Sequence, residues 1–228
     1  MFSGRNVSQT HIALSSTRIQ ATCALMGQAT GTAATLCVKL GVLPRDIAQK
    51  HMAALQEQLL RDDVFIPLRP AQDPNDLATK ASSIFGSSTT TGQASLLTDG
   101  MSRDIDDQVH HWQSDGLPAY VQLEWEKPVD LSAIEIKCDS NLQRNIMMRK
   151  DHKVNQNFGT EIPPELLKTV DFEVRIKGQW VKVGQVKNNI TRLVKAHFQS
   201  QKTTAVRINM TETYGADHVK LFEVRCYS

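Results

Sequence analysis

Acidic side chains are concentrated in a polar stretch in the middle of the chain, and carboxylate oxygens are among the ligands that calcium prefers. Asp104, Asp106 and Asp107 repeat part of the spacing of a calcium-binding loop. The glycine and the final glutamate of an EF-hand are absent, however. Two interpretations stay open: a solvated polar loop, or a Ca²⁺ held by loop carbonyls together with Asp99 or a nearby carboxylate such as Glu223.

The same stretch contains two histidines, His110 and His111. Adjacent side chains of a strand point to opposite faces, so we do not expect both to bind one metal. The sequence has no GxGxxG after a strand, no GxSxG, no HExxH and no P-loop, so it offers no recognisable catalytic residue.

Small side chains define a second feature, a helix predicted over residues 19–40. They recur every three or four positions, at Ala21, Ala24, Gly27, Gln28, Gly31 and Ala34. This spacing places a groove along one helix face, where another backbone or a flat ligand can approach closely. No charge occurs between Arg18 and Lys39, and a helix that is apolar all round is typically buried. Ordinary packing of a core helix explains the same pattern.

The composition indicates a globular protein of one or two domains. The 26 basic and 24 acidic residues form no block of like charge, so nothing favours nucleic acid as a partner. No apolar run is long enough to cross a membrane and no signal peptide is visible, so localisation stays open. The spacings of the four cysteines fit neither zinc nor a disulfide framework, and their apolar surroundings favour buried free thiols over a bridge at Cys23, Cys37, Cys138 and Cys226.

The elements change character along the chain. Gly41 is expected to end the first helix, and an amphipathic helix is predicted over 44–60, beginning at Pro44. Three prolines in 64–76 indicate a linker.

From residue 77 the apolar period becomes two, as in Tyr120–Glu126 and Val170–Ile176. About eight short strands predict an antiparallel sandwich or barrel. Trp125 and Trp180 are expected in its core. The polar loop 139–166 holds Met147, Met148, Arg149 and Lys150, which form either a docking patch or a surface loop.

Residues 4–63, beginning GRNVSQTHIALSSTRIQATCALMGQATGTAATLCVKL, resemble the C-terminal end of the catalytic domain in bacterial FAD-dependent oxidoreductases. The resemblance implies a glycine-containing turn and a small-residue helix whose N-terminus points at the flavin. The implied flavin-near residues are Gly4, Arg5, Asn6, His11, Arg18, Ala21 and Thr22. The strand–GxGxxG–helix unit of that family does not occur in these 228 residues. We therefore expect a C-terminal part of a longer, FAD-containing enzyme, not active alone.

Residues 77–228 resemble a galactose-binding-like, discoidin-type β-sandwich, through TDG at 98–100, HHWQSDG, YVQLEWEKP, KGQWVKV and VKLFEVRCY. The resemblance implies a jelly roll that binds a sugar, lipid head group or protein through loops at one end. It also implies a structural calcium with Asp99 and Glu223 as side-chain ligands, and Trp112 packed inward.

The predicted fold is therefore mainly β: a helical hairpin over 1–63, a linker over 64–76 and a sandwich over 77–228. The first functional hypothesis is an oxidoreductase fragment with an accessory sandwich. The alternative is a carbohydrate- or protein-binding module with a helical adaptor, and a third option is a sandwich that only supports the flavin domain. Expected partners are the absent flavin domain, another copy bound through the 19–40 helix, or a glycan.

Overall fold

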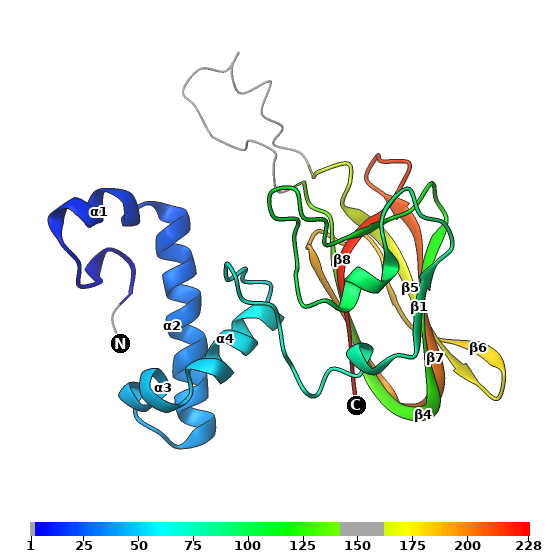
Figure 1. The fold of residues 1–228 in the computed structure, drawn as a ribbon, viewed down its shortest axis with the longest axis horizontal. Helices are drawn as coiled ribbons and strands as arrows, with labels where there is room; N and C mark the ends of the chain where they lie inside the picture. The colour runs from blue at the N-terminus through cyan, green and yellow to red at the C-terminus, as the bar shows by residue number, and fades with distance from the viewer. Residues whose placement is uncertain (1–2, 142–161) are drawn as a thin grey trace, which may run out of the picture. The chain divides into compact units, whose positions relative to one another are not determined.

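A computed structural model of the chain describes residues 3–141 and 162–228, and the chain divides into two units, Met1–Ala71 and Gln72–Ser228 (Figure 1). The predicted patch over 147–150 lies outside the described residues. The first unit is helical, with η1 (Gly4–Asn6), α1 (His11–Thr17), α2 (Gln20–Leu40), α3 (Pro44–Lys50) and α4 (Met52–Arg61). No helix in the described residues is both long and apolar enough to cross a membrane.

The ends of α2 follow from its sequence. Gly41 follows the last helical residue with φ +65°, the left-handed conformation that glycine adopts without strain. Pro44 then opens α3, and the Asp46 carboxylate accepts a hydrogen bond of 3.1 Å from the backbone N–H of Leu43. The first helix and its C-terminal glycine are therefore confirmed.

The predicted single helix over 44–60 is instead two helices. His51 separates α3 from α4 with φ −127° and ψ 18°, outside the helical region. Ile47 of α3 and Leu55 of α4 pack into one cluster with Ala33 of α2. The change of direction at His51 lets both short helices bury their apolar faces against α2.

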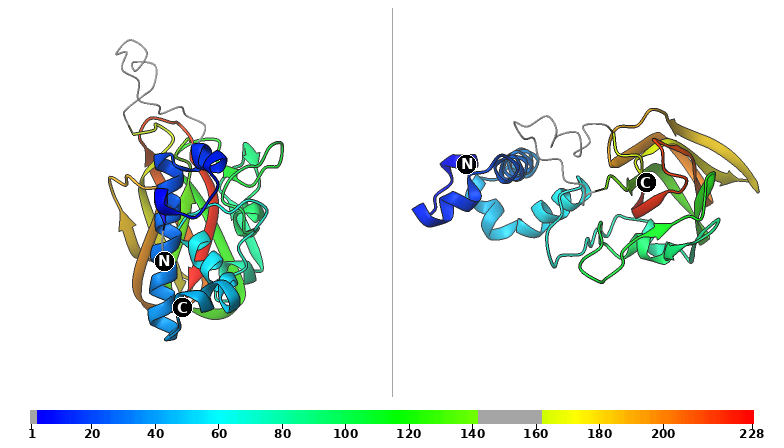
Figure 2. Two further views of the ribbon diagram at one scale, coloured as in Figure 1. Left: turned by 90° about the vertical axis from the view of Figure 1, so that its left-hand side faces the viewer. Right: turned by 90° about the horizontal axis from the view of Figure 1, so that it is seen from above.

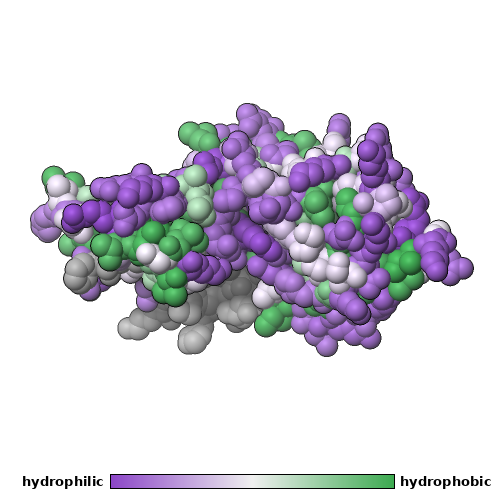
Figure 3. Space-filling view, turned by 90° about the horizontal axis from the view of Figure 1, so that it is seen from below, coloured by the Kyte–Doolittle hydropathy of each residue, from purple (hydrophilic) through white to green (hydrophobic). Residues whose placement is uncertain are grey.

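The expected burial of α2 is not found. Within this fully described helix, Ala33 is the one buried residue. All six positions of the small-residue stripe are exposed, and a Cβ added at Gly27 or Gly31 would meet no atom within 4 Å. Apolar side chains of this unit are also exposed, including Leu25 and Val38, and Figure 3 shows apolar surface here. One face of α2 packs on α3 and α4, η1 also contacts this helix, and side chains such as Leu25 and Val38 stay exposed.

The second unit is a β-sandwich whose strands join one continuous hydrogen-bonded path, in the order β2-β3-β8-β4-β7-β5-β6, with β1 paired to β4 (Figures 1 and 2). The strands are β1 (Ser83–Gly86), β2 (Thr91–Gly92), β3 (Trp112–Gln113), β4 (Ala119–Cys138), β5 (Leu167–Ile176), β6 (Gln179–Val186), β7 (Leu193–Thr213) and β8 (Lys220–Tyr227). Two 3-10 helices, η2 (Ala78–Lys80) and η3 (Ala94–Thr98), lie in the connections.

Strands β4 and β7 each take part in both layers. The first part of β4, 119–124, pairs with β1 and β7, and its last part, 133–138, pairs with β7 and β8. Register shifts between Glu124 and Val129 and between Leu131 and Ala133 mark where β4 bends from one layer to the other. The antiparallel sandwich predicted from the period-two pattern is confirmed.

The three tryptophans of the chain occupy different environments. Trp112 is fully buried and Trp125 nearly so, and the Trp125 Nε1–H donates to the Leu77 carbonyl at 2.9 Å. These two agree with expectation. The expectation that Trp180 lies in the core is wrong, because it is half-buried on the outer face of β6, where it opposes Arg175 of β5. All four cysteines are free, as predicted. Cys138 and Cys226 are buried as expected, but Cys23 and Cys37 are only half-buried, because they lie on the partly exposed helix α2.

Candidate functional site: a polar pocket at one end of the sandwich

A pocket of about 460 Å³ opens among the loops at one end of the sandwich. The end of β4, the start of β8 and the segments before β3, β5 and β8 supply its walls. Its lining combines cations, acids, an amide and one aromatic ring: Arg103, Asp104, Asp139, Asn141, Glu165, His218, Lys220 and Phe222. Lys220 and Phe222 lie on β8, and the other lining residues lie in the segments that connect the strands.

Hydrogen bonds organise the polar wall of this pocket. The Asp139 Oδ1 accepts the backbone N–H of Asn141 at 2.8 Å, and its Oδ2 lies 3.7 Å from the Lys220 ammonium. The Asn141 amide donates to Glu165 at 3.2 Å. Donors and acceptors thus alternate along one wall, the arrangement that recognises adjacent hydroxyl groups.

Phe222 gives the pocket its apolar surface. Its ring is nearly buried, with the Arg192 guanidinium 5.2 Å from the ring centroid and the His111 ring edge-on at 5.8 Å. An aromatic surface beside paired polar groups can hold the C–H face of a sugar ring while its hydroxyls are hydrogen-bonded.

The two adjacent histidines each bind their own carboxylate. His110 Nδ1 lies 2.6 Å from Asp99 Oδ2. His111 Nδ1 lies 2.8 Å from Asp104 Oδ1, and its Nε2 lies 2.9 Å from the Thr91 hydroxyl. The Asp104 carboxylate also accepts the backbone N–H of His110 at 2.8 Å. The histidines therefore fix Asp104 in the pocket wall.

The residues implied as calcium ligands already have other partners. Asp99 binds His110 and accepts the Met101 backbone N–H at 2.7 Å. The buried Glu223 lies 2.5 Å from the Lys137 ammonium and accepts from Arg225 at 2.8 Å. Burial opposes ionisation of Glu223, but the two cations outweigh it and hold the pKa of its carboxyl below the usual value.

This donor set does not fit a calcium ion, because two cations already neutralise Glu223. In the described residues, no three His, Cys, Asp or Glu side chains group as metal ligands.

The implied flavin-near residues lie in the helical unit. Gly4 has φ +74°, a left-handed conformation that glycine adopts without strain. Gly4, Arg5 and Asn6 form η1, His11 opens α1, Arg18 follows α1, and Ala21 and Thr22 lie in the first turn of α2. Ile19 is the N-cap residue of α2, and its side chain accepts no hydrogen bond from the backbone N–H groups of the first turn. An uncapped helix N-terminus fits the negatively charged edge of a flavin.

Apart from Asp104, which was considered only as a calcium ligand, the pocket residues were not predicted, because most of them are polar loop residues far apart in the sequence. Only the order of strands brings Asp139, after β4, next to Lys220, at the start of β8. The sequence did contain one indication. In the predicted last strand, Lys220 and Phe222 alternate with the core residue Leu221, which places both side chains on the face away from the core.

Comparison with known proteins agrees with both resemblances. Residues 1–59 match the model of the FAD dependent oxidoreductase family, whose cofactor is FAD. No curated protein matches the chain.

Among solved structures, chitosan-binding module 2 of a chitosanase/glucanase from Paenibacillus sp. IK-5, in complex with chitotriose, is similar with a TM-score of 0.50 and 14% identity, over 67% of this chain and 100% of that one. A variant of module 1 from the same enzyme has a TM-score of 0.50 and 14% identity, over 68% and 98%.

A family 32 module from Clostridium perfringens, in complex with galactose, has a TM-score of 0.48 and 15% identity, over 68% and 98%. At such low identity these likenesses concern the fold alone. The chain therefore joins a segment that matches the FAD-dependent oxidoreductase family, at residues 1–59, to a β-sandwich with the fold of carbohydrate-binding modules.

Proposed function

We propose that the sandwich binds a glycan in the loop-end pocket and serves an FAD-dependent oxidoreductase as an accessory domain. The observation that carries this proposal is the pocket wall of Asp139, Asn141 and Lys220 beside the Phe222 ring. The chitosan-binding module named above supports it, because that module has the same fold and was solved in complex with chitotriose.

Titration of the whole chain with a panel of mono- and oligosaccharides, followed by calorimetry, tests the proposal. Lys220→Ala removes the ammonium beside Asp139, and we expect at least about a tenfold loss of affinity, or 1.4 kcal/mol. Lys202→Ala is the matched control, since Lys202 is exposed on β7 and does not line the pocket. Equal affinities of wild type and Lys220→Ala for every bound sugar would exclude the pocket as the site.

The helical unit is proposed to complete a flavin site in the full-length oxidoreductase. Bound FAD would supply the redox chemistry by accepting a hydride equivalent from a substrate. The first turn of α2, with Ala21 and Thr22, would direct N–H groups toward the negatively charged edge of the ring. Arg18, directly before this turn, adds a positive charge, and the exposed small side chains of α2 allow close approach.

Gly4, Arg5, Asn6 and His11 are proposed to complete this surface. The 228 residues alone are expected not to retain FAD. A purified chain with the visible absorbance of a flavin would contradict that expectation.

The calcium implied by resemblance is not built into this proposal. Lys137 and Arg225 supply the positive charge that a Ca²⁺ would provide beside Glu223. We expect added Ca²⁺ or EDTA to leave the thermal midpoint unchanged. A saturable rise of the midpoint with Ca²⁺ would instead support Asp99 and Glu223 as ligands.

A further inference from the structure

Two aromatic rings and an arginine form a stack on the outer face of the sandwich, away from the loop-end pocket. The Arg207 guanidinium carbon of β7 lies 4.6 Å from the ring centroid of Tyr120 on β4 and 4.2 Å from that of Trp180 on β6. Arg175 of β5 approaches the Trp180 ring at 5.9 Å. In chain order only β5 lies between the strands of Tyr120 and Trp180, and in the sheet β7 and β5 lie between them.

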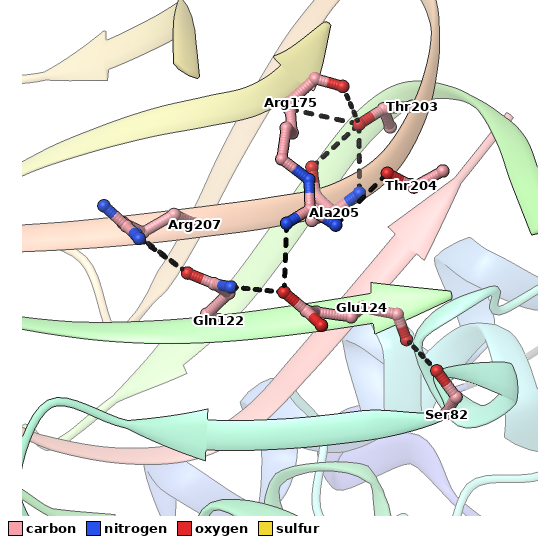
Figure 4. Close-up of polar contacts among 8 residues, drawn as sticks. All are labelled: Ser82, Gln122, Glu124, Arg175, Thr203, Thr204, Ala205 and Arg207. Atoms are coloured by element: carbon pink, nitrogen blue, oxygen red, sulfur yellow. Dashed lines mark hydrogen bonds and ion pairs between the residues drawn. The ribbon is translucent and has the colours of Figure 1, made fainter. Parts of the chain in front are cut away.

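A hydrogen-bond network fixes this arginine, as Figure 4 shows. Arg207 donates from Nε and Nη2 to the Gln122 side-chain oxygen, at 3.0 and 2.8 Å. Gln122 in turn donates to Glu124 at 2.6 Å, and Arg175 donates to the same carboxylate at 3.3 Å. These bonds use one edge of the Arg207 guanidinium. Among the described residues Nη1 has no hydrogen-bond partner, so a donor remains for a ligand.

The rings of this face are accessible to solvent. Tyr120 and Trp180 are half-buried, and Phe85 of β1, directly opposite Gln122, is 40% exposed. Two neighbouring strands add an acceptor and an amide: Glu173 opposes Arg207, and Asn209 opposes Tyr120. Aromatic surface thus alternates with donors and acceptors across β1, β4, β7 and β5.

The charge of the face selects among ligand classes. Its three basic and three acidic side chains balance: Arg175, Lys182 and Arg207 against Glu124, Asp171 and Glu173. Two internal ion pairs account for four of them, Arg175 with Glu124 at 3.3 Å and Lys182 with Asp171 at 2.8 Å. A neutral, internally paired surface attracts neither a polyanion nor a polycation. Aromatic rings can contact the C–H faces of a ligand while the neighbouring polar groups form hydrogen bonds with its hydroxyls, so this surface suits a carbohydrate.

We propose that the face formed by Phe85, Tyr120, Gln122, Trp180 and Arg207 is a second glycan site, which binds an uncharged oligosaccharide chain. This face shares no residue with the loop-end pocket. An open sheet face can bind several consecutive sugar units of a chain, whereas a pocket binds the end of a chain. The proposal extends the proposed glycan binding to another surface and does not require the pocket to be occupied.

Tryptophan fluorescence gives a readout specific to this face. Trp112 and Trp125 are buried, so acrylamide quenching of the chain reports mainly on Trp180. The probes are fully N-acetylated chitohexaose and cellohexaose, both uncharged. We expect at least one of them to protect Trp180 from acrylamide. Trp180→Phe should lose the protection signal while calorimetry still detects binding, because the ring is retained.

Variants separate the two sites. Trp180→Ala and Tyr120→Ala are each expected to weaken hexasaccharide binding at least about tenfold, and Val181→Ala, on the opposite side of β6, serves as the matched control. Thermal melts establish whether each variant is folded. If Trp180→Ala does not fold, the affinity of Tyr120→Ala alone tests whether the sheet face binds the hexasaccharide. Lys220→Ala should leave binding at the sheet face unchanged.

Each alternative outcome is decisive. If Lys220→Ala alone abolishes hexasaccharide binding, the proposed function stands and the sheet-face site is excluded. If only the Trp180 and Tyr120 variants lose binding, the sheet-face site stands and the pocket is excluded as the site of that hexasaccharide. If the wild-type chain binds neither hexasaccharide, the sheet-face proposal fails.

Discussion

Asp76 should make the stability of the sandwich depend on pH in an unusual direction. The residue is 5% exposed, and its carboxylate Oδ1 accepts hydrogen bonds from the backbone N–H groups of Ala78 and Cys226, each at 2.9 Å. Burial is the larger effect and raises the pKa of Asp76 from 3.8 to about 6, although both hydrogen bonds favour the ionised form. The folded protein therefore holds this proton more tightly than the unfolded chain does.

The size of the effect follows from the pKa values. A rise from 3.8 to about 6 corresponds to roughly 3 kcal/mol, at about 1.4 kcal/mol per pKa unit. Because the folded-state pKa is the higher one, the stabilisation is complete below pH 3.8 and is lost as the pH rises through about 6. Asp76→Asn keeps an oxygen acceptor and cannot ionise, so it avoids this loss.

We therefore expect Asp76→Asn to exceed the wild type in free energy of unfolding by up to about 3 kcal/mol near pH 7. The difference should shrink toward zero near pH 4. Urea unfolding followed by tryptophan fluorescence measures it, since all three tryptophans lie in Gln72–Ser228. Other titrating groups are common to both proteins and cancel. A difference that does not change with pH would refute the argument.

Three further predictions concern particular positions. Gly92→Ala should destabilise the sandwich by about 3 kcal/mol or more, because φ is +68° and the new Cβ would lie 1.8 Å from the His111 carbonyl oxygen; an unfolding midpoint equal to wild type would contradict this. Thr203→Val should cost about 1–3 kcal/mol in urea, because the buried hydroxyl bonds the backbone on two strands, and a neutral effect would show that those groups find other partners. Leu25→Gln with Val38→Gln should reduce self-association of the chain in sedimentation velocity, because both side chains are exposed and apolar; an unchanged monomer in wild type and variant would exclude α2 as a contact.

The helical unit was largely predictable because its signals are local. Gly41 and Pro44 specify where α2 ends and α3 begins, and both positions are confirmed. The break at His51 was not predictable from periodicity, since the apolar residues on either side keep a helical spacing. It depends on how two short helices fit the same partner. The exposure of α2 was also missed, because apolar composition does not identify what covers a helix.

In the sandwich, the alternation of apolar and polar residues predicted which strand residues face the core. The wrong placement of Trp180 could have been avoided by following this alternation. Trp180 alternates with Val181 and Val183 and shares the parity of Lys182, which places it on the outer face. A large aromatic side chain was assigned to the core on its residue type alone. The Tyr120, Arg207 and Trp180 stack and the loop-end pocket depend on strand order, which no local pattern contains.

The bends of β4 and β7 have a consequence for how the sandwich opens. Because each strand carries hydrogen bonds of both layers, one layer cannot separate without breaking the ladder of the other. Amides on either side of the bend, such as Val121 and Ile136, should therefore exchange with solvent through the same global opening, with equal protection free energies. A ligand that distorts one layer would then displace the other layer through the continuous backbone of β4 and β7, and no loop would have to move.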